Sequence, residues 1–164
     1  MLNINVVGSN HKVPVMAKDP NNKHGLTWKF KPFDLLTQPN EYFLLMQAIG
    51  LINVRSYRDE VCNGNFKMLP GGRSFDDVFV DGRVWISFLV NAQGLLGLTG
   101  GNDIAVSDSA FIYAKSRPEP AAEIAAVIIH ELAHVNGAQD HNKQAETIVM
   151  VCGFYDQCKP GVIG

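Results

Sequence analysis

Residues 121–135 read AAEIAAVIIHELAHV, and this stretch decides how the second half of the chain folds. Ala, Leu and Ile dominate it, which is typical of a buried helix. Pro120 stands at its start and acidic Glu123 lies in the first turn, where the helix dipole favours negative charge. Gly137 follows at the position where a left-handed residue commonly ends a helix. The pattern therefore predicts an α-helix over residues 120–136.

The same predicted helix carries two histidines and a glutamate in the order HELAH. His130 and His134 are four residues apart, so on a helix both imidazoles project from one face and can bind one ion. Glu131 lies beside the first histidine and can face the same ion without binding it. This is the HExxH arrangement, in which two histidines bind zinc and the carboxylate accepts a proton from water.

HELAH in this setting resembles the active-site helix of the zincin metallopeptidases, and the order of strand, loop and apolar helix in residues 103–136 is similar to their core. The resemblance implies that His130 and His134 bind Zn²⁺ and that Glu131 is the general base. It implies a zinc-dependent metalloendopeptidase that hydrolyses a peptide or protein substrate. The motif is equally compatible with a zinc amidase or deacylase acting on a non-protein amide, or with an inactive zincin-derived binding module.

A catalytic zinc site needs a third protein ligand, and three residues after the helix qualify. Glu146 is our first choice, on a second helix over residues 142–152 that packs against the active-site helix, as in the gluzincins. Asp140 is the first alternative, because HELAHVNGAQDH resembles the HExxHxxGxxD pattern of the snapalysin-like metzincins. Met150 is then the candidate for a methionine turn, although its surroundings look regular rather than turned. His141 is the second alternative.

The remaining segments predict one further helix and several strands. Residues 39–52 have a Pro-Asn start and helical spacing, which predicts a helix that ends at Gly50. Residues 69–82 are turn-rich, and the glycine-rich residues 91–102 are interpreted as a mobile surface loop. Three segments with alternating or β-branched and aromatic residues are predicted as strands: 52–60, 83–90 and 102–113.

These elements predict an α+β fold with a small twisted mixed sheet, an active-site helix that carries HExxH, and a following C-terminal helix. We expect one domain over residues 1–164, with residues 1–33 as a peripheral N-terminal arm of short strands and loops. By the resemblance to zincins, the substrate adds to the sheet edge above the active-site helix, and the predicted strand at 102–113 is the candidate for that edge.

Composition limits the class of partner and leaves the compartment open. The 164 residues are 46% hydrophobic and 18% charged, which suits one globular domain, and the formal net charge is −2. Such a chain has no basic field to attract nucleic acid or an anionic membrane. No stretch is apolar enough to span a bilayer, and the N-terminus lacks the pattern of a signal peptide. Export as an effector or toxin domain, or membership of a larger polypeptide, is compatible with this. A monomer is the default.

Two histidines and three cysteines complete the set of reactive side chains. His11 and His24 lie in polar, irregular sequence far from the motif and are interpreted as surface residues. The cysteines are odd in number, at positions 62, 152 and 158. The short loop between Cys152 and Cys158 could close a disulfide in an oxidising compartment.

Overall fold

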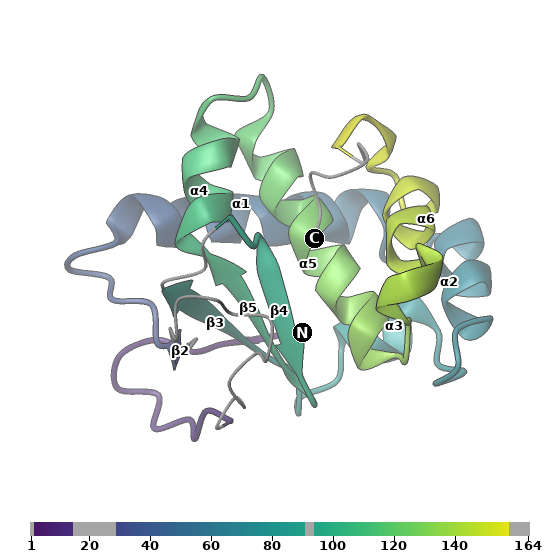
Figure 1. Cartoon of the computed structure of the whole chain (residues 1–164), viewed down its shortest axis with the longest axis horizontal. Helices are drawn as coiled ribbons and strands as arrows, with labels where there is room; N and C mark the ends of the chain where they lie inside the picture. Colours follow the sequence, from purple (N-terminus) through teal and green to yellow (C-terminus); the bar gives the residue numbers. More distant parts are fainter. Residues whose placement is uncertain (1, 15–28, 91–93, 158–164) are drawn as a thin grey trace.

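The computed structural model describes residues 2–14, 29–90 and 94–157, which form an α+β fold (Figure 1). The strands of its mixed five-stranded sheet are β1 (Asn3–Ile4), β2 (Lys29–Lys31), β3 (Trp85–Val90), β4 (Gly97–Gly100) and β5 (Asp103–Ser107). The six α-helices in these residues are α1 (Pro39–Arg55), α2 (Glu60–Lys67), α3 (Phe75–Phe79), α4 (Asp108–Lys115), α5 (Pro120–Val135) and α6 (Gln144–Val151). Two short 3-10 helices follow α5 and α6: η1 (Asp140–Asn142) and η2 (Tyr155–Gln157).

The sheet is ordered β1-β3-β5-β4, and β2 pairs with β3 as well. Strands β1, β3 and β5 are parallel to one another, whereas β2 and β4 run antiparallel to their neighbours. The sequence predicted the sheet edge at residues 102–113, and this is wrong. Strand β5 lies between β3 and β4, so β4 is the edge strand on the side of α5.

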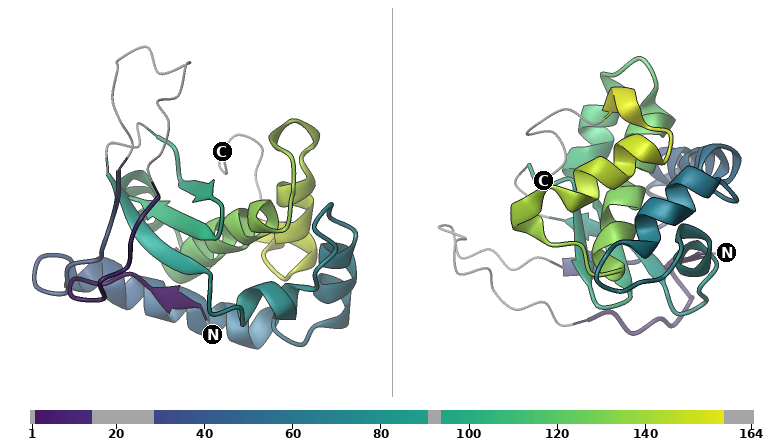
Figure 2. Two further views of the ribbon diagram at one scale, coloured as in Figure 1. Left: turned by 90° about the horizontal axis from the view of Figure 1, so that it is seen from below. Right: turned by 90° about the vertical axis from the view of Figure 1, so that its right-hand side faces the viewer.

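Helix α5 packs against every layer of the fold. It contacts β4 and β5 of the sheet, α1 and α4, and also α6. Figures 1 and 2 show α5 running from the sheet towards the group formed by α2, α3 and α6 at the other end of the molecule. All residues from Ala122 to Ala133 are buried, including Glu123 and the HExxH residues within this range. The helix predicted over 120–136 is thus confirmed as a central buried helix.

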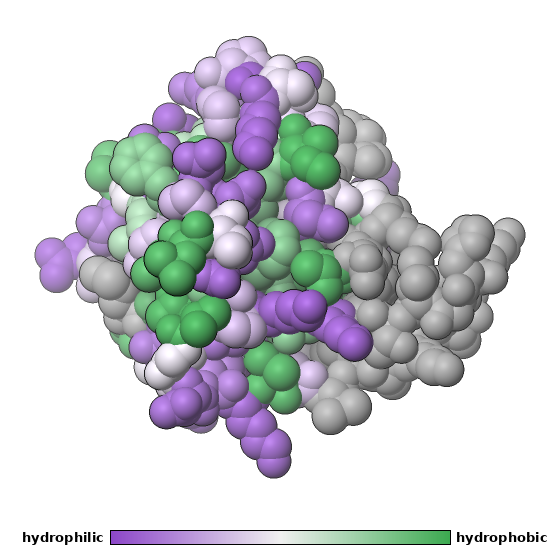
Figure 3. All heavy atoms as spheres, turned by 90° about the vertical axis from the view of Figure 1, so that its left-hand side faces the viewer, coloured by the Kyte–Doolittle hydropathy of each residue, from purple (hydrophilic) through white to green (hydrophobic). Residues whose placement is uncertain are grey.

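Alternation along the strands creates two apolar clusters, one on each face of the sheet. Ile86 and Phe88 of β3 belong to the main core, with the buried side chains of α1 and α5. Leu89 instead packs with Phe30 of β2 and Ala105 of β5 on the opposite face. Elsewhere, the exposed large hydrophobic residues form small separate patches among polar ones on the face shown in Figure 3, as on ordinary protein surfaces.

The first helix is longer than predicted, and the strand predicted at 52–60 is wrong. Helix α1 continues through Gly50 to Arg55, because its buried face extends over Ala48, Ile49 and Ile52. Gly50 is exposed and nothing lies within 4 Å of the position of a Cβ there, so this glycine ends nothing. The rest of 52–60 leads into α2, whose N-cap Asp59 accepts a hydrogen bond from the backbone of Cys62.

Two further segments differ from the sequence prediction. The glycine-rich segment 91–102 contains β4, so from Gly97 to Gly100 it is a strand and not a loop, while residues 91–93 lie outside the described part of the chain. The strand predicted over 102–113 ends at Ser107, whose hydroxyl accepts a hydrogen bond from the backbone N–H of Ala110 and so begins α4. The strand predicted at 83–90 and the helix predicted after Asn142 are confirmed as β3 and α6.

The N-terminal segment contributes to both the sheet and the core. β1 pairs in parallel with β3, and Leu2 and Phe33 are buried in the main core. His11 is also more enclosed than the sequence indicated, and its interpretation as a surface residue is wrong. Its ring stacks on Trp85 at 4.1 Å and pairs with the carboxylate of Asp103, and only 15% of its side chain is exposed.

A disulfide joins Cys62 of α2 to Cys152, which caps α6. The two residues are 90 positions apart in sequence and both side chains are fully buried. The bridge between Cys152 and Cys158 that the sequence suggested is therefore wrong, because Cys152 is already paired. Cys158 and His24 lie outside the described residues.

In the part of the chain that the structure describes, no helix has the length and apolar character needed to cross a membrane.

Candidate functional site

The two histidines of HELAH point their Nε2 atoms at the same place. His130 and His134 follow each other by one turn of α5, and their Nε2 atoms are 3.1 Å apart. Two nitrogens bound to one tetrahedral zinc at about 2.0–2.1 Å lie roughly 3.3 Å from each other. The spacing of this pair therefore suits two ligands of one zinc ion.

The second ring nitrogen of His134 fixes which tautomer is present. Its Nδ1 lies 2.8 Å from the carbonyl oxygen of Ala138. Because a carbonyl can only accept, Nδ1 carries the hydrogen and Nε2 is left to present its lone pair. Histidines that bind metals are oriented by hydrogen bonds of this kind to the other nitrogen. Gly137 makes the contact possible, since its φ of +89° turns the chain back beneath the helix end, as its predicted role as C-cap requires.

Asp140 places a carboxylate beside His134. It lies in η1, and its Oδ1 is 3.3 Å from Nε2 of His134, while its side chain is exposed to solvent. An oxygen and a nitrogen that both present lone pairs repel each other unless a proton or a cation stands between them. This separation also matches that of two ligands of one zinc ion, at roughly 3.3 Å.

The other two candidates for the third ligand occupy the next turns of the chain. Glu146 lies in the first turn of α6 and is half-buried. His141 lies in η1, and its side chain is outside the described part of the structure. Among the described side chains, no group of three or more His, Cys, Asp or Glu is arranged to hold a metal ion. The described residues thus bring together the imidazole pair, and Asp140 lies beside His134 without completing a group of three.

Glu131 is held against the edge strand β4. The hydroxyl of Thr99 lies 2.6 Å from Oε2 of Glu131 and 3.1 Å from its backbone oxygen. The side chain of Glu131 is buried, and burial raises its pKa to about 8. The hydrogen bond from Thr99 opposes this rise, and the negative charge of Asp140 adds to it. A carboxyl group with such a pKa can both accept and release a proton near neutral pH.

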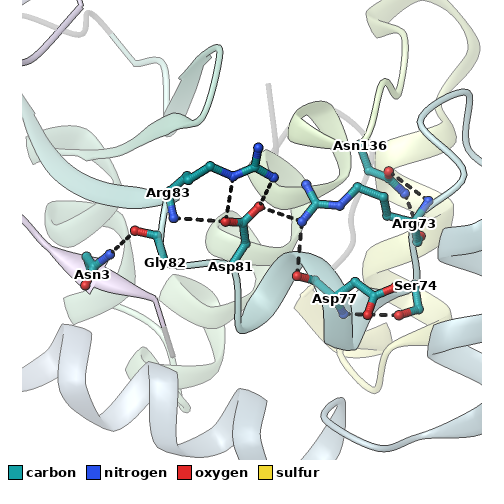
Figure 4. Close-up of polar contacts among 8 residues, drawn as sticks. All are labelled: Asn3, Arg73, Ser74, Asp77, Asp81, Gly82, Arg83 and Asn136. Carbon is teal, nitrogen blue, oxygen red and sulfur yellow. Dashed lines mark hydrogen bonds and ion pairs between the residues drawn. The ribbon is translucent and has the colours of Figure 1, made fainter.

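The end of α5 is fixed by the side chain of Asn136, as Figure 4 shows. Its Nδ2 donates to the carbonyl oxygens of Phe66 and Arg73, both at 2.8 Å, and its Oδ1 accepts from the backbone N–H of Arg73 at 3.2 Å. The backbone of Gly71 approaches so closely that a Cβ there would lie 2.4 Å from Oδ1 of Asn136. Residues 69–82, which the sequence predicted only as turn-rich, therefore fix the end of α5 and the starting point of the turn formed by residues 137–140.

Two arginines extend this network to the sheet. Asp81 accepts hydrogen bonds from Arg73 at 2.6 Å and from Arg83 at 2.8 Å (Figure 4). Hydrogen bonds from Arg83, and then from Arg73, hold the pKa of Asp81 well below its usual range. The side chain of Asn3, next to Gly82, joins β1 to the same turn.

Sequence reasoning missed the partners that orient the HExxH residues. Thr99, Ala138 and Asn136 each make a hydrogen bond that positions the site or the helix end. The alternation of GLTG in residues 97–100 was an available signal for a strand, but its glycines favoured a loop. The methionine-turn candidate Met150 lies in regular helix α6, beside a cavity of about 520 Å³ at the N-terminal end of α5. It does not lie in a turn.

Comparisons of the chain with protein-family models, with curated proteins and with solved structures found no match.

Proposed function

We propose that the protein is a zinc-dependent metalloendopeptidase with a zincin-like core. One observation carries the proposal: His130 and His134 present their Nε2 atoms 3.1 Å apart on a buried helix, with Glu131 beside them. Burying two imidazoles and a carboxylate together costs free energy, because each group loses hydration. A cluster that is kept despite this cost favours a functional site. The hydrogen bond from His134 to Ala138 supports it, because it leaves Nε2 free to bind a metal.

His130 and His134 would hold the zinc, and we now favour Asp140 over Glu146 as the third ligand. The 3.3 Å between Oδ1 of Asp140 and Nε2 of His134 supports this choice. Asp140 also follows Gly137 with the spacing of the snapalysin-like pattern. Glu146 and His141 stand as the alternatives. When bound, zinc supplies Lewis acidity, which polarises a carbonyl and makes water a stronger acid.

Glu131 would act as the general base and then as the general acid. Its carboxylate would accept a proton from the attacking water as the C–O bond forms by addition to the carbonyl carbon. It would then return that proton to the nitrogen of the leaving amine, and the C–N bond would break. A raised pKa suits both steps, because the group gains and loses a proton without a large energy difference.

The edge strand β4 would bind the peptide. In the described part of the chain β4 pairs with β5 alone, so its outer backbone groups face away from the sheet. A peptide that adds to this edge would pass over α5, where β4 already contacts Glu131. This strand replaces the predicted strand 102–113 as the candidate substrate edge.

The buried disulfide supports a place of action outside a reducing cytosol. Disulfides form and persist mainly in oxidising compartments. A bridge between Cys62 and Cys152 therefore suits an exported effector domain better than a cytosolic enzyme.

The test compares metal content and hydrolysis of an unstructured protein such as casein. We expect the wild-type protein to bind one equivalent of zinc and to cleave casein, and Glu131→Gln to keep the zinc and lose the cleavage. Glu123→Gln is the matched control, because Glu123 is a buried glutamate on the same helix, paired with Arg117 and two turns before the motif. Undiminished cleavage by Glu131→Gln would contradict the proposal.

The same assay decides the third ligand and the class of amide. Asp140→Ala should lower the zinc affinity far more than Glu146→Ala, and the reverse order would restore Glu146. If the wild-type protein binds zinc but cleaves no peptide bond, the endopeptidase proposal is refuted. Hydrolysis of small acylated amines would then indicate an amidase or deacylase.

A further inference from the structure

The carboxylate of Glu131 is held in a two-part cradle on β4. Thr99 donates from Oγ1 to Oε2 at 2.6 Å, which is short for a hydrogen bond between two oxygens. On the same face of the strand, two residues earlier, Gly97 lies against the other carboxylate oxygen. A Cβ at Gly97 would be 2.5 Å from Oε1 and 2.9 Å from the carboxylate carbon. Thr99 thus bonds Oε2 of Glu131, and the absence of a side chain at Gly97 leaves space for Oε1.

The alternation of β4 explains why these two residues face Glu131. Successive side chains of a strand point to opposite faces, so Gly97 and Thr99 share one face. Leu98 between them packs on the other face, with the cluster around Phe30 and Leu89. Gly97 has no positive φ and needs no special backbone conformation. Its lack of a side chain therefore has a different reason, which is the space that the carboxylate occupies.

We propose that Thr99 is a positioning residue for the general base, and that Gly97 provides the space in which Thr99 holds it. This inference rests on the proposed function, because it gives Glu131 its role. The hydroxyl of Thr99 fixes the rotamer and the plane of the carboxylate, and it does so from the strand to which we assign the substrate. Strand β4 would in this way position both Glu131 and the bound peptide.

The hydroxyl is well suited to this role because two acceptors lie within its reach. Its single hydrogen can be donated to Oε2 or to the backbone oxygen of Glu131, at 2.6 and 3.1 Å. Its lone pairs can in turn accept a hydrogen from the carboxyl group. Thr99 can therefore remain in contact with Glu131 before and after the residue takes a proton. Valine has the same shape and offers neither contact.

The kinetic test uses Thr99→Val and the conservative variant Thr99→Ser. We expect Thr99→Val to lower kcat by roughly 10- to 100-fold, with KM changed less than about two-fold and an unchanged zinc content, because misplaced catalytic groups cost about this much. Thr99→Ser should stay within about three-fold of wild type, since it keeps the hydroxyl. Thr147→Val is the matched control, because Thr147 is an exposed residue of α6 whose hydroxyl donates to the backbone carbonyl oxygen of Lys143.

A second test needs no metal and no activity. In metal-free protein we expect Thr99→Val to lower the urea midpoint of unfolding more in the wild-type background than in a Glu131→Ala background, where only the longer contact with the backbone oxygen remains. Such a double-mutant cycle isolates the contact between the two side chains. Equal shifts in both backgrounds would show that Thr99 does not stabilise the carboxylate of Glu131, and would overturn the proposal.

Gly97→Ala tests the other half of the cradle. The added methyl group must displace Oε1, so we expect a loss of kcat similar to that of Thr99→Val while zinc content is kept. Gly64→Ala is the control, because nothing lies within 4 Å of a Cβ at that position in α2. Wild-type kcat in Gly97→Ala or in Thr99→Val, or equal losses in Thr99→Val and Thr99→Ser, would refute the positioning role alone. A wild-type protein that hydrolyses nothing would refute the proposed function itself.

Discussion

Removal of the disulfide between Cys62 and Cys152 should be the most damaging single covalent change to the fold. A cross-link between residues 90 positions apart restricts the unfolded chain and stabilises the folded protein by about 4.5 kcal/mol on the chain-entropy model. A bridge between Cys152 and Cys158, six positions apart, would contribute only about 2 kcal/mol on the same model. The size of the effect therefore distinguishes the two pairings.

The assay is urea unfolding of the oxidised protein, of the reduced protein, and of a Cys62→Ala/Cys152→Ala double variant. Reduction should remove the loop-closure contribution alone. The double variant should lose somewhat more, because both cysteines are fully buried and their sulfur atoms leave unfilled space. Cys158→Ala is the control and should keep nearly all of the stability. Peptide mapping that finds Cys152 bound to Cys158, or a reduced protein as stable as the oxidised one, would refute the reasoning.

Three further outcomes can be measured by urea unfolding of the metal-free protein. The pKa of Glu131 is raised to about 8 from an ordinary value near 4.5. As the pH rises, the unfolded state therefore loses this proton at a lower pH than the folded state does. The free energy of unfolding should therefore fall as pH rises from about 4.5 to about 8, by at most about 5 kcal/mol, and Glu131→Gln should abolish that slope. Asn136→Ala should cost about 2–4 kcal/mol, because it removes three hydrogen bonds to the backbone of Phe66 and Arg73, and a cost under about 0.5 kcal/mol would contradict the role of Asn136 at the helix end. His11→Ala should cost about 1 kcal/mol through its loss of the Trp85 stack and the Asp103 pair, and an unchanged urea midpoint would contradict this role of His11.

The sequence predicted the elements whose signal is local and continuous. Helix α5 is apolar on nearly every side, starts at a proline and ends before a glycine with positive φ, so each part of its pattern agrees with the others. Strand β3 is likewise a run of β-branched and aromatic residues that is buried on both faces. In these two elements propensity and burial favour the same structure.

The prediction was wrong where a distant partner determines the local structure. Strand β4 consists of Gly-Leu-Thr-Gly, a weak strand former by propensity, and it exists because β5 pairs with it and α5 packs beneath it. Residues 52–55 alternate like a strand but belong to α1, since Ile52 continues the buried face of that helix. Neither partner is visible in the local pattern, so tertiary contacts override it.

The third ligand illustrates the same limit at the level of a single side chain. The helix expected over residues 142–152 favoured Glu146, because a helix that begins by Asn142 turns this residue back towards α5, although its separation from His134 is shorter than is usual in gluzincins. In the structure α6 begins at Gln144, and a 3-10 turn precedes it. That turn starts at Asp140, which is placed there by the reversal at Gly137 and by the hydrogen bond from His134 to Ala138. The turn of residues 137–140 thus makes Asp140 the favoured candidate for the third ligand. The hydrogen bonds of Asn136 fix the end of α5 and therefore the point at which this turn begins.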